Sequence, residues 1–304
     1  MAQNEVLQNE NHYDQLINGW TPLDQAITRD PNSELVQFLA SNGAELGSYA
    51  FPHEIEHGGT IEVIKKFIEL GANINEMWVF TNGRRYYPLD KAIDIERTDI
   101  VRILLESGAN PNNIHSYPLE RAIVLDNTDI VHLLTDHGAN VNSSPIGDYQ
   151  SAPLYLAIDY CRPKMVQLLI EKGAEVEYPL NGNEMSPLQT ALKNQVDHEI
   201  IQCLVENGAN VDIQNEDSKD SALHTAIERD VLDQMLGLED FSYIAATRNV
   251  KTLLEYGAKC NVKNKDNYTP LEISLTNAFK GQEDPEDDKD PGDQTFKLFM
   301  YHQH

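Results

Sequence analysis

The sequence LLESGANPN at residues 104–112 recurs in several versions along the 304-residue chain. Each version has apolar residues, then two or three polar residues, then Gly-Ala. The copies are FLASNGAEL (38–46), FIELGANIN (67–75), LLESGANPN (104–112), LLTDHGANV (133–141), LLIEKGAEV (168–176), CLVENGANV (203–211) and LLEYGAKCN (253–261). Recurrence at intervals scattered around 33 residues is typical of arrays in which each unit packs only on its neighbours.

A second phrase precedes the Gly-Ala phrase in each unit. Its copies are TPLDQAI (21–27), YPLDKAI (87–93), YPLERAI (117–123), APLYLAI (152–158), SPLQTAL (186–192), SALHTAI (221–227) and TPLEISL (269–275), with a worn copy AFPHEIE at 50–56. Proline in the first turn loses no helical hydrogen bond, so this phrase predicts the start of a first helix. The following Leu and Ala share one face at helical spacing.

Each unit is predicted to continue into a second helix, which begins at TDIV in residues 98–101 and 128–131. Thr or Asp is the expected N-cap residue there. Ile100, Ile103 and Leu104 would form the buried stripe. Gly108 occupies the position at which a left-handed residue ends a helix.

Two phrases in this fixed order resemble the ankyrin repeat, whose consensus contains T-P-L-H-x-A and a Gly-Ala helix end. The resemblance covers about residues 20–304. It implies an all-α solenoid of about eight helix-turn-helix units with finger loops, and a concave face that binds another protein. The array spans 20–280, with units near 20–49, 50–80, 87–115, 117–147, 152–181, 186–216 and 221–265, and a last repeat at 268–304. Residues 1–19 are expected to add an N-terminal capping helix with Leu7, Leu16 and Ile17 facing inward.

An insertion at residues 76–88, EMWVFTNGRRYYP, is the strongest candidate contact site. Asn82-Gly83 between alternating residues predicts a β-hairpin. Tryptophan, tyrosine and arginine often dominate interfaces. The predicted partner-binding residues are Trp78, Phe80, Arg84, Arg85 and Tyr86, extended on later fingers by Tyr149 and Tyr178. The alternative is a longer finger whose aromatic residues only pack on neighbouring fingers.

Two further segments interrupt the period. Residues 231–246 carry an apolar stripe that predicts an extended or additional helix used for packing. Residues 281–293, GQEDPEDDKDPGD, split the last unit and predict a solvated acidic loop. The final residues 296–300 can supply a helix that caps the array.

Composition narrows the range of partners. Lys plus Arg is 23 and Asp plus Glu is 49, so the net charge is −26. Binding to nucleic acid is not expected, because its affinity begins with neutralised phosphates, and no apolar run is long enough for membrane insertion. Three scattered cysteines and no visible signal peptide favour a cytoplasmic location, although secretion into a host cell by a signal-peptide-independent route stays open. Polar fingers and the large net charge favour a monomer. We therefore expect a non-enzymatic scaffold for a protein partner not yet identified, either an intracellular adaptor or a host-directed effector, with no cofactor or bound metal.

Two alternative functions remain. His53-Glu54-Ile55-Glu56-His57 fits the H-E-x-x-H pattern of a zinc-dependent hydrolase, with Glu54 as general base and Glu76 as a conceivable third ligand. Gly58-Gly59 would end that helix at once, and the longer metal-binding motif is absent. The other alternative is a rigid spacer or oligomerisation element. His224 occupies the usual histidine position of the ankyrin phrase, where it would bond to nearby backbone.

Overall fold

The computed structural model describes residues 19–79, 85–143, 152–177, 185–194, 196–235 and 242–274. Several predicted features lie outside these residues: Phe80, Arg84, Tyr149, Tyr178, the acidic loop 281–293, the final segment, and the N-terminal segment except Gly19. Those predictions stay predictions.

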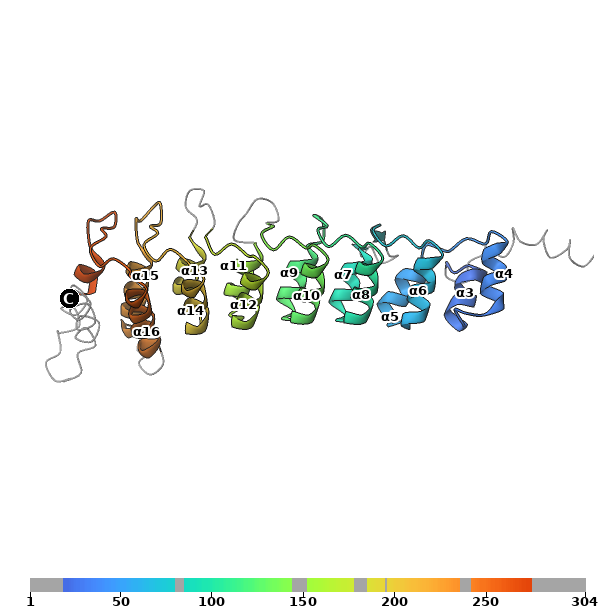
Figure 1. Ribbon diagram of the computed structural model, residues 1–304, viewed down its shortest axis with the longest axis horizontal. Helices are drawn as coiled ribbons and strands as arrows, with labels where there is room; N and C mark the ends of the chain where they lie inside the picture. The colour runs from blue at the N-terminus through green and yellow to red at the C-terminus, as the bar shows by residue number, and fades with distance from the viewer. Residues whose placement is uncertain are drawn as a thin grey trace, which may run out of the picture. The chain divides into compact units, whose positions relative to one another are not determined.

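The first of two compact units, Met1–Asn140, contains helix pairs and a hairpin (Figure 1). The pairs are α3 (Pro22–Arg29) with α4 (Glu34–Ser41), α5 (Ala50–His57) with α6 (Ile61–Glu69), α7 (Pro88–Asp94) with α8 (Thr98–Glu106), and α9 (Pro118–Val124) with α10 (Thr128–Asp136). Strands β1 (Trp78–Val79) and β2 (Arg85–Tyr86) pair antiparallel. First helices stack in the order α5, α7, α9, and second helices in the order α6, α8, α10.

The second unit, Val141–His304, repeats this plan. Its pairs are α11 (Pro153–Asp159) with α12 (Pro163–Glu171), α13 (Pro187–Lys193) with α14 (His198–Glu206), and α15 (Ala222–Met235) with α16 (Ser242–Glu255). The all-α solenoid fold is confirmed, and the described residues contain seven helix pairs. An eighth pair is not complete within them, because only residues 270–274 of its first helix are described.

The described parts of the inserted segment, residues 231–235 and 242–246, belong to α15 and α16. α15 and α16 have 14 residues each, whereas α13 and α14 have 7 and 9. This matches the extended-helix alternative of the prediction. None of the described helices has the length and apolar character needed to cross a bilayer.

Most second helices end at a glycine with a positive φ, as predicted. Gly108 has φ +93°, and a Cβ atom built there would meet nothing within 4 Å. The left-handed backbone, and not a lack of space, is therefore what favours glycine.

The predicted N-caps are wrong by one residue. Thr98 and Thr128 are the first helical residues of α8 and α10, and the caps are Arg97 and Asn127. The Asn127 side chain accepts a hydrogen bond from the backbone N–H of Ile130. Asparagine caps a helix as well as threonine does, and the sequence offered both in succession.

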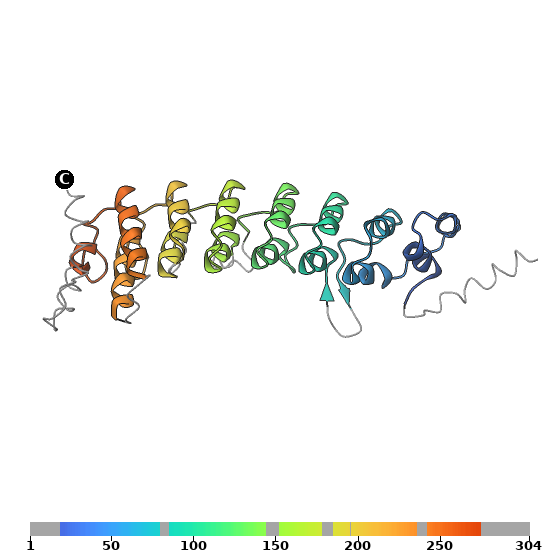
Figure 2. The same ribbon diagram turned by 90° about the horizontal axis from the view of Figure 1, so that it is seen from below.

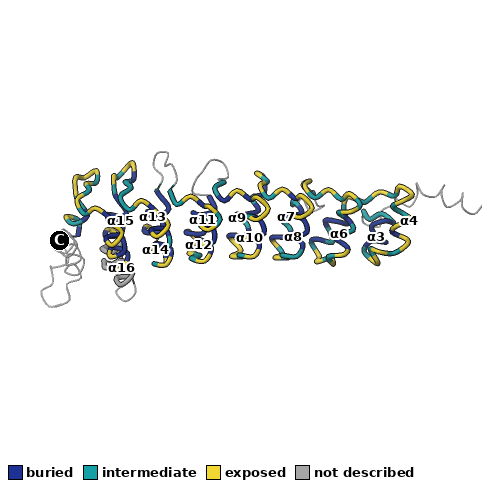
Figure 3. The backbone as a smooth tube through the Cα atoms, in the orientation of Figure 1, coloured by how far each residue is buried: buried dark blue, intermediate teal, exposed yellow. Residues whose placement is uncertain are grey.

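The buried core residues recur at the same position in successive repeats. The residue four positions before each helix-ending glycine is fully buried in every pair except the first: Phe67, Leu104, Leu134, Leu169, Leu204 and Leu253. Figure 3 shows the buried residues on the sides of the helices that meet within each unit, with exposed residues at their ends and on the fingers.

The residue after Leu in the first-helix phrase connects one repeat to the next finger. In the second unit Tyr155 Oη donates to the carbonyl of Met185 at 2.8 Å, and Gln189 Nε2 donates to that of Asp220 at 2.9 Å. The backbone N–H of Ser221 donates to His224 Nδ1, so Nε2 carries the proton and donates to the carbonyl of Tyr268 at 3.1 Å. The expected backbone bonding of His224 is confirmed.

A ladder of side-chain hydrogen bonds joins successive fingers through the residue four positions after the helix-ending glycine. In the first unit Asn112 Nδ2 donates to the carbonyl of Gly138, and Asn112 Oδ1 accepts from the N–H of Asn140, both at 2.8 Å. Asn75 and Asn142 repeat both bonds with their own next fingers. Glu177 and Asp212 stand at the same position and accept from the next finger. We call these residues rungs.

Replacing Asn112 tests the ladder. Asn112→Ala removes both bonds and should lower the free energy of unfolding by about 1–2 kcal/mol, since each hydrogen bond contributes about 0.5–1.5 kcal/mol. Asn112→Asp keeps the acceptor, as Asp212 does naturally, and should cost about half as much. Urea unfolding measures both, and hydrogen exchange at the Asn140 amide should quicken only in the alanine variant. Equal exchange in both variants would contradict the assignment.

Candidate binding surfaces

The hairpin at residues 78–86 has two different faces. Trp78 pairs with Tyr86 and Val79 pairs with Arg85, so each pair occupies one face of the small sheet. Both strands extend from the finger that joins α6 to α7 (Figure 2). Trp78 and Tyr86 are half-buried, whereas Val79 and Arg85 are exposed. The alternation of strand side chains separates an inner face from an outer face.

The inner face anchors the hairpin to the helices. The Trp78 ring meets the ring of Phe51 edge-to-face at 5.5 Å, and Phe51, which is only 2% exposed, packs on Phe67. Lys91 Nζ lies 4.9 Å from the centre of the Tyr86 ring and 3.0 Å from Glu56 Oε1. Two of the predicted contact residues, Trp78 and Tyr86, therefore have a structural role, and the partners that anchor them, Phe51 and Lys91, belong to helices α5 and α7 and not to neighbouring fingers.

The outer face presents side chains to solvent. Val79 is 63% exposed and Met77, just before β1, is 39% exposed. Arg85 is exposed opposite Val79. On the next finger Ile114 is 71% exposed. Of the predicted residues only Arg85 lies on this face within the described part of the hairpin. The sequence analysis missed Met77 and Val79, although the period-two alternation from Trp78 could have shown that Val79 faces away from it.

A hollow of about 370 Å³ lies beside the hairpin within the first unit. Leu46 and Tyr49 of the preceding finger line one part of it, and Met77, Trp78 and Val79 line another. It is large enough to accept one or two side chains of a partner. The outer face and this hollow together form a continuous candidate surface, because Met77 and Val79 belong to both.

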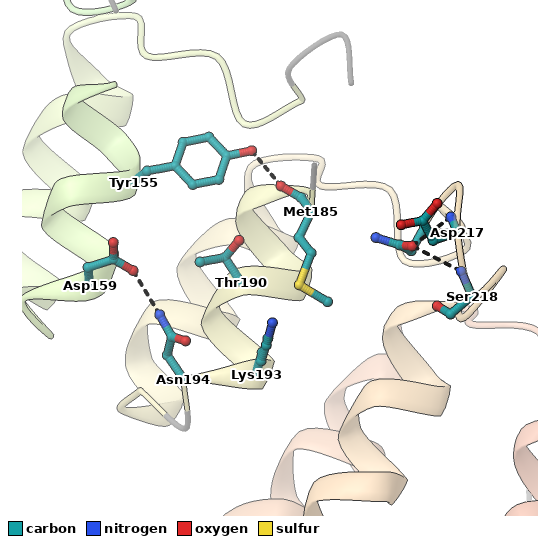
Figure 4. Close-up of a pocket in the computed structure, with 9 residues that line it drawn as sticks. Tyr155, Asp159, Met185, Thr190, Lys193, Asn194, Asp217 and Ser218 are labelled. Carbon is teal, nitrogen blue, oxygen red and sulfur yellow. Dashed lines mark hydrogen bonds between the residues drawn. The ribbon is translucent and has the colours of Figure 1, made fainter. Parts of the chain in front are cut away.

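The second unit has a polar pocket of about 480 Å³ (Figure 4). Tyr155 and Asp159 of α11, Thr190, Lys193 and Asn194 of α13, and Asp217 and Ser218 of the following finger are among its lining residues. Asn194 Nδ2 donates to Asp159 Oδ1 at 2.7 Å. Partial burial raises the pKa of Asp159, and this hydrogen bond acts in the opposite direction. The pocket combines first helices and a finger, which is the placement expected for a binding face.

The His53–His57 segment lies on α5, which Gly58 ends with φ +78° as predicted. The two imidazole rings stack with centroids 4.0 Å apart, and His57 Nδ1 donates to the carbonyl of His53 at 3.0 Å. Glu76, the conceivable third ligand, accepts a hydrogen bond from Asn73 within its own finger. Within the described ranges no group of three or more His, Cys, Asp or Glu side chains is placed to hold a metal ion.

The paired helices, the glycines with positive φ at their ends and the finger loops define a helical repeat protein. The family model described as ankyrin repeats matches residues 53–145, 115–179 and 154–240, which together span more than half of the chain. The chain belongs to the ankyrin repeat family, whose domains generally mediate protein–protein interactions and typically lack catalytic activity.

Two solved ankyrin repeat domains show the same fold. The domain of Bcl-3, described as a unique member of the IkappaB protein family, is 22% identical with a TM-score of 0.55, over 93% of this chain and 99% of that one. The domain of human ASB11 is 18% identical with a TM-score of 0.51, over 93% of this chain and 98% of that one. A comparison with curated proteins gives no match. At these identities the likeness concerns the fold alone.

Proposed function

We propose that the protein is a non-enzymatic scaffold that binds a partner protein through its finger loops and first helices. The principal contact is the outer face of the hairpin, formed by Met77, Val79 and Arg85, with the adjoining hollow. The observation that carries the proposal is that the two faces of the hairpin differ. Trp78 and Tyr86 pack on the helices, while Val79 on the opposite face is 63% exposed. Arginine is enriched among the residues that dominate interfaces, and Val79 and Met77 add exposed apolar area beside Arg85.

The polar pocket of the second unit is a secondary contact in this proposal. It offers carboxylates at Asp159 and Asp217 and an ammonium group at Lys193, so it suits polar side chains of a partner. The net charge of −26 favours encounter with a basic protein surface. The scaffold acts as a monomer inside a cell, as an adaptor or as a host-directed effector.

A double variant tests the outer face. Val79→Asp with Arg85→Glu should reduce partner capture from cell lysate about tenfold or more, because contacts at the centre of an interface often contribute 2 kcal/mol or more. Its melting temperature should match that of the wild type, since both side chains are exposed. Quantitative mass spectrometry of the captured proteins and thermal unfolding are the two measurements.

Two further variants serve as controls for the capture experiment. Arg102→Glu changes an exposed residue of a second helix and should capture like the wild type. Trp78→Ala should lower both capture and the melting temperature, because it removes the contact with Phe51. Undiminished capture by the Val79/Arg85 double variant would refute the hairpin as the principal contact.

A further inference from the structure

The second helix of the first pair, α4, has an apolar face that is open in the described structure. Leu35 is 56% exposed and Phe38 is 63% exposed. They stand eight and five positions before the helix-ending Gly43. Scattered exposed apolar residues are ordinary, but these two lie on one face at i, i+3 spacing.

The same two positions are covered in the later repeats. Eight positions before the glycine, exposure falls to 4% or less at Val63, Ile100, Ile130, Met165 and Ile200. Five positions before it, exposure is 6% at Ile103, Leu133 and Leu168, and Lys66 and Cys203 are half-buried. Among the described pairs, the first is therefore the one in which both positions are exposed.

The last described pair shows what these positions contact. In α16 they are Asn249 and Thr252, 8% and 7% exposed. Asn249 Oδ1 is 2.7 Å from His198 Nδ1, and Thr252 Oγ1 is 3.5 Å from His198 Nε2. His198 begins α14, the second helix of the preceding repeat. The face that contains Leu35 and Phe38 is therefore the face that receives a preceding element.

We propose that residues 1–18 of this chain cover that face of α4. They lead directly into α3, so they are tethered beside it. A helix of 18 residues would be about 27 Å long and α4 only about 12 Å, at 1.5 Å per residue, so the segment is long enough. Tyr13, Leu16 and Ile17 have the i, i+3, i+4 spacing of one helical face. Docking is intramolecular, and it is independent of the proposed partner binding.

Single substitutions in the full chain test the docking. Phe38→Asp should lower the melting temperature by about 3–6 °C, as the loss of a buried aromatic contact does in a domain of this size. Gln37→Asp, at an exposed position of the same helix, should leave it unchanged within about 1 °C. Leu16→Asp should lower it as Phe38→Asp does. An unshifted Phe38→Asp variant would overturn the proposal.

A double-mutant cycle identifies the occupant. Leu16→Asp added to Phe38→Asp should have less than about a third of its effect in the wild type, because contacting residues are not additive. Additive effects would refute direct contact. Light scattering on the same samples should show a monomer throughout. A dimer that Phe38→Asp dissociates would instead assign the face to a second copy of the chain.

Discussion

Replacing Leu104 with alanine is expected to lower the free energy of unfolding by about 2–5 kcal/mol. Leu104 is fully buried in α8, at the core position that leucine or phenylalanine occupies in every described pair. The cavity would open between α7 and α8 and against the neighbouring helices α6 and α10, which α8 also contacts. Urea unfolding followed by circular dichroism measures the loss.

Hydrogen exchange adds a local measurement, since repeat arrays do not always unfold in one step. Amides of α8 should exchange faster in the Leu104→Ala variant. Arg102→Ala, exposed on the same helix, should change stability by less than about 0.5 kcal/mol. A Leu104→Ala variant as stable as Arg102→Ala would show that the buried stripe of α8 is misassigned.

Replacing Asp90 with asparagine is expected to stabilise the protein at neutral pH. Asp90 follows Leu in the first-helix phrase of α7, where Tyr155, Gln189 and His224 of other repeats donate to the next finger. It is 2% exposed, and its Oδ1 has no hydrogen-bond partner among the described residues. An ionised carboxylate cannot donate, so Asp90 cannot make the donated bond that Tyr155, Gln189 and His224 make.

Burial raises the pKa of Asp90 from 3.8 to about 6, although the hydroxyl of Ser116 and the charge of Arg121 oppose the shift. The pKa of Asp90 is higher in the folded than in the unfolded protein, so between pH 3.8 and about pH 6 the folded protein binds more protons than the unfolded protein does. The contribution of protonated Asp90 is present below about pH 3.8 and is lost as the pH rises through about 6. At neutral pH the cost of ionised Asp90 is about 3 kcal/mol, since one pKa unit is about 1.4 kcal/mol.

Asp90→Asn should therefore raise the free energy of unfolding by up to about 3 kcal/mol at pH 7.5, with little change at pH 4. Asp99→Asn is the control of opposite sign. The Arg97 guanidinium lowers the pKa of Asp99, whose stabilising effect is present at neutral pH and is lost as the pH falls. Asp99→Asn should destabilise at pH 7.5. Equal pH profiles for wild type and Asp90→Asn would contradict the assignment of the proton to Asp90.

The repeated phrases predicted the helix pairs and their glycine ends because those features depend on local sequence. Pro118 at the start of α9 and Gly108 at the end of α8 are examples. The faces of the hairpin depend instead on Phe51, which is far away in sequence and draws Trp78 inward. Composition alone favoured tryptophan over valine as a contact residue, and the structure reverses their exposure. Burial of Asp90 and exposure of Phe38 likewise follow from neighbouring repeats, which no single phrase contains.

The rungs also have a consequence for protein engineering. The hairpin insertion lies between the rung Asn75 and Pro88, the first residue of α7. It therefore interrupts neither the hydrogen bonds of the rung nor the helix that follows. The sequence between Asn142 and Pro153, and between Glu177 and Pro187, has the same flanks. These intervals are natural splice points: a reporter peptide, a fluorophore site or a second recognition loop could be grafted there while the helix spacing on either side is kept.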